Sequence, residues 1–200
     1  MSDPMINADM CVHCGACTKI CLFLEKYQID LAEFSRQPEL AYSCFLCGKC
    51  GEICPRSVNG AGIALRMRAE QTGRGAGARR DRAYQGFLWE KNPYKFANYR
   101  KATGKTVLFP GCNFPSFYPK TTKQLEKLLK KHGIGVVYEC CEKPVHELGL
   151  IEDAGKAVKQ MEKRLTERGV EELVIVCPNC YYYLEGKIHI PRLSVYEKLT

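Results

Sequence analysis

Two groups of four cysteines in the first 54 residues share one spacing, C-x2-C-x2-C-x3-C. They are Cys11, Cys14, Cys17 and Cys21 in the first run, and Cys44, Cys47, Cys50 and Cys54 in the second. Three thiolates spaced this closely can bind three irons of one cubane, and the fourth cysteine of such a run binds the cubane of the other run. The spacing therefore predicts two [4Fe–4S] clusters.

The predicted ligand sets cross between the two runs. One cubane is expected on Cys11, Cys14, Cys17 and Cys54, and the other on Cys44, Cys47, Cys50 and Cys21. Gly15 and Gly48 lie where the loop has to approach a cluster closely. Zinc is the alternative, but it usually takes two C-x2-C pairs per ion and needs no third cysteine after two further residues. The spacing therefore favours iron–sulfur clusters over zinc at these eight cysteines.

Five more cysteines lie in the second half of the chain. They are Cys112 in the segment FPGC, Cys140 and Cys141 in YECCEKP, and Cys177 and Cys180 in CPNC. The adjacent pair is poorly suited to a disulfide, because successive Cα atoms lie about 3.8 Å apart and a relaxed disulfide requires roughly 4.4–6.8 Å. Two adjacent thiolates that both point at one metal group explain the pair better.

Strands and helices are expected to alternate around these five cysteines. The expected strands are 105–109, 135–139 and 172–176, and the expected helices between them are 121–133 and 152–169. This order predicts a parallel sheet with right-handed crossovers. Each cysteine group follows the carboxyl end of a strand, and these ends form the edge where open α/β sheets place ligand sites. We therefore expect all five sulfurs at one edge of the sheet.

Apolar residues occupy one face of each of these two helices. In helix 121–133 they are Leu125, Leu128 and Leu129, and in helix 152–169 they are Ala154, Val158, Met161 and Leu165. These stripes predict which faces pack against the sheet.

The first region is poor in β-branched residues and is predicted to be helical, with helices in 18–27, 38–47 and 59–71. The predicted fold class is an α+β multidomain protein, in which an α-helical two-cluster domain precedes an α/β domain with a parallel sheet. The expected boundaries are 1–65 for the two-[4Fe–4S] domain, 66–104 for a basic and aromatic connector, and 105–200 for the cysteine-rich α/β domain.

Composition limits the cellular setting. Thirteen cysteines in 200 residues suit either a secreted disulfide scaffold or an intracellular metal protein. The start of the chain shows no basic and apolar leader, and the longest apolar run, 173–176, is too short to cross a membrane. The odd cysteine count and the C-x2-C spacings favour thiolate ligands over disulfides. We therefore expect a cytoplasmic protein without a transmembrane segment.

Positive charge is concentrated in the connector. Residues 56–105 contain 12 Lys and Arg against 3 Asp and Glu, in a chain of net charge +8. Together with its aromatic residues, this segment has three interpretations: a linker packed against both domains, a docking surface for an acidic redox partner, or a nucleic-acid site. We favour the linker, then the docking surface, and expect no nucleic-acid binding.

Two resemblances to known families rest on these motifs. The two cysteine runs resemble the dicluster ferredoxin modules of heterodisulfide reductase and of membrane-associated dehydrogenases. The set FPGC, CCEKP and CPNC resembles the CCG cysteine-rich domain of heterodisulfide reductase, which also occurs in iron–sulfur subunits of anaerobic glycerol-3-phosphate dehydrogenase and of glycolate and lactate oxidases. Glu142 stands where this family usually has glycine, and the chain has one such domain where most relatives have two.

The second resemblance implies a noncubane [4Fe–4S] cluster, with zinc as the alternative, on Cys112, Cys140, Cys141, Cys177 and Cys180. It also implies that Cys140 and Cys141 are the catalytic residues. The implied function is that of an electron-transfer subunit of a heterodisulfide reductase-like oxidoreductase. Such a subunit passes electrons through two cubanes to the five-cysteine site for disulfide chemistry.

Two other functions are alternatives. The chain would then be the iron–sulfur subunit of an anaerobic glycerol-3-phosphate, glycolate or lactate dehydrogenase that delivers electrons to quinone, or a non-catalytic metal-binding protein with zinc at the five-cysteine site. The expected redox partner is a flavoprotein or a ferredoxin. A second CCG-containing subunit or a second copy of this chain is a further candidate partner, and membrane contact is expected only through a partner.

Overall fold

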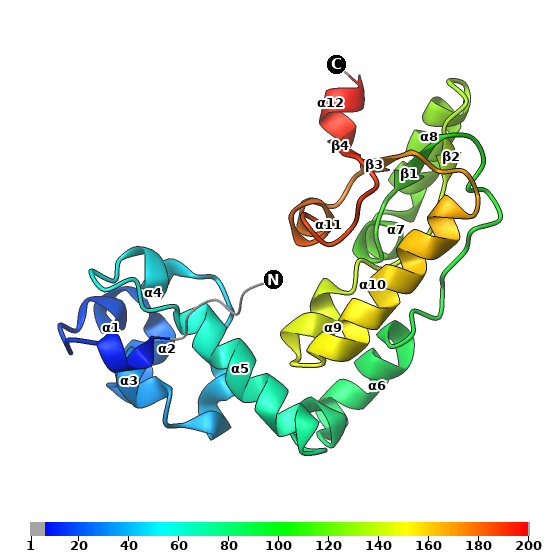
Figure 1. The fold of residues 1–200 in the computed structure, drawn as a ribbon. Coiled ribbons are helices and arrows are strands. Elements are labelled where there is room, and N and C mark those ends of the chain that lie inside the picture. Colours follow the sequence, from blue (N-terminus) through cyan, green and yellow to red (C-terminus); the bar gives the residue numbers. More distant parts are fainter. Residues whose placement is uncertain (1–6, 200) are drawn as a thin grey trace. The chain divides into compact units, whose positions relative to one another are not determined.

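The computed structural model describes residues 7–199, which divide into two compact units (Figure 1). The first unit extends to Gln85 and also contains Glu147–Ile151, while the second contains Gly86–His146 and continues from Glu152. The predicted α+β class is confirmed, because the described residues of the first unit form helices without a strand and the second unit holds a parallel sheet. None of the helices within residues 7–199 is long and apolar enough to cross a membrane.

Short helices flank the two cysteine runs of the first unit. The elements are η1 (Ala8–Met10), α1 (Ala16–Ile20), α2 (Leu22–Tyr27), α3 (Leu31–Phe34), η2 (Pro38–Ser43), α4 (Lys49–Glu52), α5 (Gly60–Gly73), η3 (Gly77–Arg79) and the start of α6 (Arg82–Lys91). The prediction of a helix over 38–47 is wrong in its second half, because the 3-10 helix η2 ends at Ser43 and Cys44 is extended. The expected helix 18–27 is likewise interrupted, at Cys21, where the backbone is extended.

The loops that carry the two cysteine runs have the same backbone conformation. Gly15 and Gly48 have φ of 73° and 79°, a region that glycine enters without steric cost, and each directly precedes a short helix. His13 and Leu46, each two residues before its glycine, are also left-handed, with φ of 52° and 57°. The repeated cysteine spacing therefore folds into repeated local structure.

Arg68 on α5 holds together several backbone segments of the first unit. It is only 6% exposed, and its guanidinium donates to the backbone carbonyls of Ala41, Cys44 and Glu147 at 3.1, 2.5 and 2.6 Å. The guanidinium also lies over the Tyr42 ring, 5.1 Å from the ring centroid. A buried cation is costly unless it is hydrogen-bonded, and these contacts offset that cost.

Four parallel strands form the sheet of the second unit, in the spatial order β2-β1-β3-β4. They are β1 (Thr106–Phe109), β2 (Gly135–Val136), β3 (Glu172–Ile175) and β4 (Arg192–Ser194). The three expected strands are present, although β2 is shorter than expected. The strand β4 has no counterpart among the expected strands, because its three residues include only one apolar side chain.

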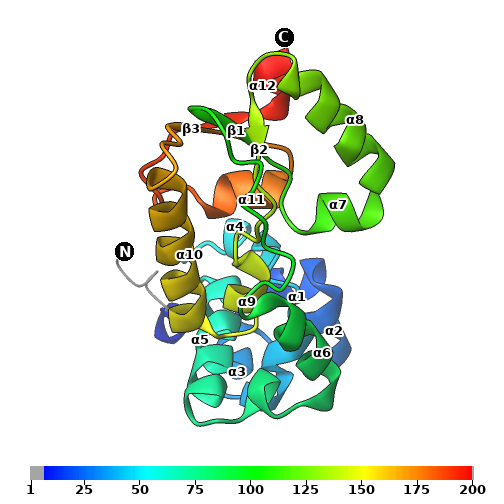
Figure 2. The same cartoon turned by 90° about the vertical axis from the view of Figure 1, so that its right-hand side faces the viewer.

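Helices cover both faces of this sheet (Figure 2). The helices after β1 are α7 (Asn113–Phe117), α8 (Pro119–Lys130), α9 (Lys143–Glu147), α10 (Ile151–Thr166), α11 (Pro178–Tyr183) and α12 (Val195–Leu199). The stripe predicted on α10 is confirmed, because all four of its residues are buried, and α10 shares a core with Val107 and Phe109. On the other face, Leu129 of α8 packs with Leu108. The stripe predicted on α8 is only partly right, because it runs through Thr122 and Leu129, while Leu128 is 45% exposed.

Residues 86–104 belong to the second unit. Asn98 forms an antiparallel bridge with Tyr138, with N–H···O distances of 2.8 and 3.0 Å in the two directions. The backbone N–H of Val136 donates to the carbonyl oxygen of Lys101 at 2.8 Å. The second half of the basic and aromatic segment is therefore hydrogen-bonded along the β2 side of the sheet.

Arg68→Met should lower the free energy of unfolding by about 2–4 kcal/mol, because buried carbonyls lose a charged donor. The matched control on the same helix is Arg66→Met, since Arg66 is exposed and pairs with Glu70 at the surface. The control should change the stability by less than about 0.5 kcal/mol. Chemical denaturation of anaerobically purified protein, followed by circular dichroism, measures both, and equal losses in the two variants would contradict the role of Arg68.

Candidate metal centre

All thirteen cysteines are described and all are free thiols. In the first unit, Cys17 and Cys50 are buried, Cys14 and Cys47 are exposed, and the remaining four are half-buried. Each run therefore presents sulfur both to the core of the unit and to its surface.

Cys21, which belongs to the first run, lies close to the cysteines of the second run. Burial, followed by the negative charges of Cys44, Cys21 and Cys47, raises the pKa of Cys50 to about 11. Burial also raises the pKa of Cys44, with further contributions from Cys21 and Cys47. The structure thus brings together the four sulfurs predicted to bind one cubane, and their mutual repulsion as thiolates is what a bound cation relieves.

The other predicted set is anchored on the core of the first unit. Cys17 lies in that core, and Cys11 and Cys54 pack against it. Cys14 is exposed at the end of the loop. The structure therefore places three members of this set at one core and the fourth at the surface.

At three places a backbone N–H donates to the sulfur of the cysteine two residues earlier. These bonds run from His13 to Cys11, from Leu46 to Cys44 and from Glu142 to Cys140, each with an N···Sγ distance of 3.4 Å. The three donating residues have φ of 52°, 57° and 68°. Hydrogen bonds to sulfur stabilise the thiolate form and tune a bound cluster. The second unit therefore repeats, at Cys140, the turn found in both loops of the first.

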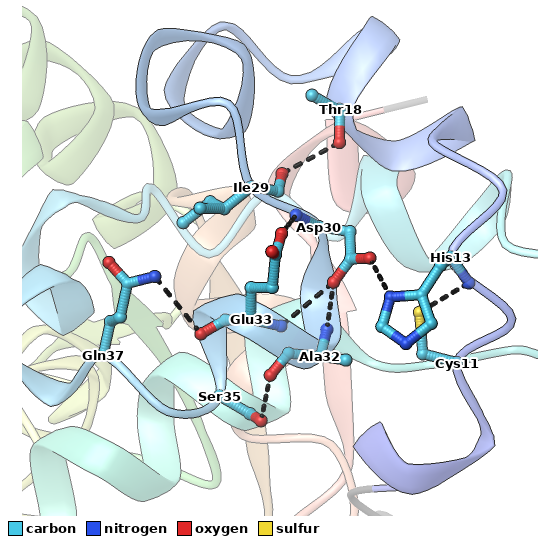
Figure 3. A network of polar contacts seen from close by, with 9 residues as sticks. All are labelled: Cys11, His13, Thr18, Ile29, Asp30, Ala32, Glu33, Ser35 and Gln37. Atoms are coloured by element: carbon cyan, nitrogen blue, oxygen red, sulfur yellow. Dashed lines mark hydrogen bonds and ion pairs between the residues drawn. The ribbon is translucent and has the colours of Figure 1, made fainter.

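His13 and Asp30 form a polar contact beside Cys11 (Figure 3). His13 Nδ1 lies 2.5 Å from Asp30 Oδ2, while Asp30 Oδ1 accepts the N–H groups of Ala32 and Glu33 and caps α3. Burial alone would raise the pKa of Asp30, but the Glu33 N–H and His13 outweigh it and lower that pKa. Ligand atoms of Cys11, His13 and Asp30 lie within 4.8 Å of one another. The cap and the histidine contact explain this group without a separate metal.

The five sulfurs of the second unit form a continuous chain of contacts. Cys112, Cys140, Cys141 and Cys180 are buried and Cys177 is half-buried. The Sγ atoms of Cys112 and Cys140 are 3.7 Å apart. Further contacts between thiol groups join Cys140 to Cys141, Cys141 to Cys180, and Cys180 to Cys177. The loops after β1, β2 and β3 thus bring all five predicted site cysteines to one edge of the sheet.

Shared protons divide these thiols into donors and thiolates. The Cys180 thiol donates to Cys177 and lowers the pKa of Cys177 to about 6. Cys140 and Cys180 both donate to Cys141 and hold its pKa well below the ordinary value, whereas the same contacts raise the pKa of Cys180. Cysteines bind metals as thiolates, with release of such protons. Five contacting and mostly buried sulfurs are therefore a donor set that fits a metal group.

Gly111, in FPGC, allows the loop after β1 to approach the CPNC loop. Its φ is 75°. A Cβ atom at this position would lie 2.8 Å from Cys180 Sγ and 3.3 Å from Cys177 Cβ, and the first distance is shorter than real Cβ atoms show. The glycine is therefore required by both the backbone conformation and the space.

A buried ammonium group lies beside Cys112. Lys91, the last residue of α6, is 6% exposed, and its Nζ pairs with Glu90 Oε1 at 2.7 Å and lies 5.0 Å from the centroid of the Tyr94 ring. The pKa of Cys112 is raised by its contact with Cys140 and by burial, and Lys91 acts in the opposite direction. Sequence reasoning does not single out Lys91, because nothing in the basic segment marks the lysine that folds inwards.

Two buried glutamates flank the cysteine pair. Glu139 accepts hydrogen bonds from the Tyr99 hydroxyl at 2.7 Å and from the Cys140 N–H at 2.9 Å. Glu142 is 3% exposed, and its Oε2 has no hydrogen-bond partner among the described residues. Burial, followed by the charges of Glu139 and Cys112, raises the pKa of Glu142 to about 8. The glutamate at the family's glycine position is therefore part of the site.

Comparison with known proteins adds a family to this geometry. Residues 106–185 match the family model described as CCG, the cysteine-rich domain, which confirms that resemblance. A curated relative is a subunit of the fumarate reductase (CoM/CoB) of Methanothermobacter marburgensis, with 24% identity over 213 aligned residues. The alignment covers 85% of this chain and 41% of the relative, so the chain spans about two fifths of the relative's length. No solved structure matches the chain.

Gly111→Ala should remove metal from the five-cysteine site but not from the first unit, because the added Cβ meets Cys180 Sγ and alanine resists a φ of 75°. Gly155→Ala is the matched control, since nothing lies within 4 Å of a Cβ there. In the helix α10 this alanine should stabilise the protein by about 0.5–1 kcal/mol. Metal content per chain and thermal unfolding measure both effects. An unchanged metal content in Gly111→Ala would contradict the close approach of the two loops.

Proposed function

Residues 106–185 carry a CCG cysteine-rich domain, and we propose on this basis that the chain is an iron–sulfur electron-transfer subunit of a heterodisulfide reductase-like oxidoreductase. Electrons would pass through two [4Fe–4S] cubanes to a metal group at the five-cysteine site. There a disulfide would take up two electrons and two protons and become two thiols. The observation that carries this proposal is the contact of five sulfurs from three loops at one edge of the sheet.

The proposed ligands are the thirteen cysteines. The two cubane sets are Cys11, Cys14, Cys17 and Cys54, and Cys44, Cys47, Cys50 and Cys21; the noncubane [4Fe–4S] cluster would take Cys112, Cys140, Cys141, Cys177 and Cys180. When bound, such clusters supply one-electron transfer at potentials set by hydrogen bonds and burial. The closeness of Cys21 to Cys50 supports the crossed cubane sets.

The surrounding residues have separate roles in this proposal. The Glu142 N–H stabilises the Cys140 thiolate, and the Glu139 carboxylate fixes the backbone N–H of Cys140. The burial of Cys140 and Cys141 excludes water from the pair on which the disulfide chemistry is proposed to depend. Lys91 places a positive charge next to Cys112, where it offsets the negative charge of the thiolates.

The relative's name supports partner subunits for this chain. That protein is named as one subunit of an enzyme, and the present chain spans only part of its length. We propose a flavoprotein or a ferredoxin as the electron donor, with a second CCG-containing subunit or a second copy of this chain as a further partner. Because the relative is named as a fumarate reductase subunit, the second candidate function is electron transfer to or from a separate dehydrogenase subunit. Co-purification with a flavoprotein would favour that candidate.

Anaerobically purified protein should contain about 12 irons per chain, about eight in the cubanes and about four at the five-cysteine site. Cys140→Ser should lose only the latter, together with an EPR signal that responds when an oxidised sample is treated with a thiol. Cys14→Ser is the matched variant, because it should lose cubane iron and keep that signal. Zinc at the site with about eight irons elsewhere would contradict the noncubane cluster, and fewer than about eight irons would contradict the electron-transfer role.

Lys91→Met should lower the midpoint reduction potential of the group at the five-cysteine site, because an added electron loses a nearby positive charge. At an effective dielectric constant of about 20, a charge roughly 8 Å away contributes about 2 kcal/mol, or about 90 mV for one electron. Lys95→Met is the control, since Lys95 is exposed beside the Trp89 ring and water screens it. EPR-monitored redox titration measures both potentials, and equal shifts would show that the burial of Lys91 has no special effect.

A further inference from the structure

Glu142 combines three features that disfavour a glutamate in the metal-free chain. Its φ of 68° lies in the left-handed region, which glycine enters freely and other residues do not. Its side chain is buried, and within residues 7–199 Oε2 meets no hydrogen-bond donor. The charges nearest to it include those of Glu139 and Cys112, which repel it. A carboxylate buried in this way requires a cation or a donor.

The turn at Cys140 explains the backbone of Glu142 but not its side chain. The left-handed φ directs the Glu142 N–H to Cys140 Sγ, as it does for His13 and Leu46 in the first unit. Glycine at this position would make the same bond at no steric cost. The presence of a carboxylate therefore needs a reason of its own.

Neighbouring polar groups do not supply a partner for Oε2. Lys91 is a nearby cation, but its Nζ pairs with Glu90 at 2.7 Å. Glu139 shows that this segment can satisfy a buried glutamate, because one of its oxygens accepts from Tyr99 and the other from Cys140. Three residues further along the chain, Glu142 Oε2 is left without such a donor.

What does surround the carboxylate of Glu142 is sulfur. It makes a side-chain contact with Cys140 and lies close enough to Cys112 to be affected by its charge. We propose that Glu142 is an oxygen ligand of the metal group at the five-cysteine site, on the side of Cys112 and Cys140. This inference rests on the proposed function, because it requires a metal group there. A bound cation would satisfy Oε2 and remove the repulsion between the carboxylate and the thiolates.

The ligand set of this chain would then differ from five sulfurs alone. Both iron and zinc accept a carboxylate oxygen besides thiolate sulfur. A glycine has no donor atom, so a domain with glycine at this position leaves the corresponding metal position open to a further ligand. Glu142 occupies that position, and a substrate sulfur would have to displace it.

Mössbauer spectroscopy of the full chain enriched in 57Fe tests this ligand. Compared with the wild-type protein, Glu142→Gly should lose an iron component of higher isomer shift, typical of mixed sulfur and oxygen coordination, without loss of iron. Glu142→Gln should lose or weaken the same component. Gln28→Gly is the control for backbone strain, because Gln28 has a φ of 55° and lies in the first unit. It should leave the spectrum unchanged.

Metal retention and thermal stability provide a second readout. Removal of the oxygen ligand should accelerate loss of metal from the site to a chelator by about tenfold or more, because even indirect changes at metal sites cost roughly 10–100-fold in affinity. The metal-free Glu142→Gly protein should melt at a higher temperature than the metal-free wild type, since strain and a buried charge disappear. Metal should raise the melting temperature of the wild type more than that of Glu142→Gly.

The outcomes separate this inference from the function on which it rests. If Cys140→Ser leaves the metal content unchanged, the proposed function fails and the ligand fails with it. If Cys140→Ser loses metal but Glu142→Gly keeps the wild-type spectrum and chelator rate, the ligand alone is overturned. If the site holds zinc, X-ray absorption at the zinc edge replaces the Mössbauer measurement. An oxygen neighbour at about 2.0–2.2 Å should then be present in the wild type and absent in Glu142→Gly, and its absence in both would overturn the ligand.

Discussion

A hydrogen bond from a backbone N–H to the sulfur two residues earlier recurs in each of the three cysteine groups proposed to hold metal. The bond requires the donating residue to adopt a left-handed φ, which turns the chain around the sulfur. This conformation cannot continue a helix or a strand of L-residues. The cysteines therefore lie in loops, and the elements on either side have to be short or end there. In the first unit, this is why η2 stops at Ser43 and α4 begins only after Gly48.

The two units bring their sulfurs together in different ways. In the first unit the spacing within each run does so locally, and only Cys21 has to reach the other run. In the second unit the sulfurs are far apart in sequence, and the parallel sheet places the ends of β1, β2 and β3 at one edge. The second arrangement depends on the core between α10 and the sheet, where Val158, Met161 and Leu165 pack. Contacting thiols share protons until a cation replaces them, so metal binding and folding are coupled in both units.

The sequence predicts those features that depend on local spacing or on a simple period. The three long strand segments, the α10 stripe and the position of the five cysteines after the strands follow from alternation, and the structure agrees with them. It does not reveal β4, whose three residues gain their strand conformation from pairing with β3. Nor does it reveal that Lys91 is buried beside Cys112, because inward folding of one lysine is decided by tertiary packing rather than by residue type. Glu142 is visible in the sequence as a departure from the family pattern, but its unpartnered oxygen is visible only in the structure.

The shared turn makes its third residue the one that distinguishes the three groups. The backbone N–H gives each sulfur the same bond, so the side chain at this position sets the local difference. His13 contacts Asp30 at the surface, and Leu46 packs against the core of its unit. Glu142 instead brings a negative charge into a buried space that already contains thiolates, where charges interact strongly because water does not screen them. Such a charge disfavours reduction, and the buried ammonium of Lys91 on the Cys112 side acts against it. The balance of these two residues, rather than the cysteines that the family shares, is then what gives the site of this chain its own redox properties.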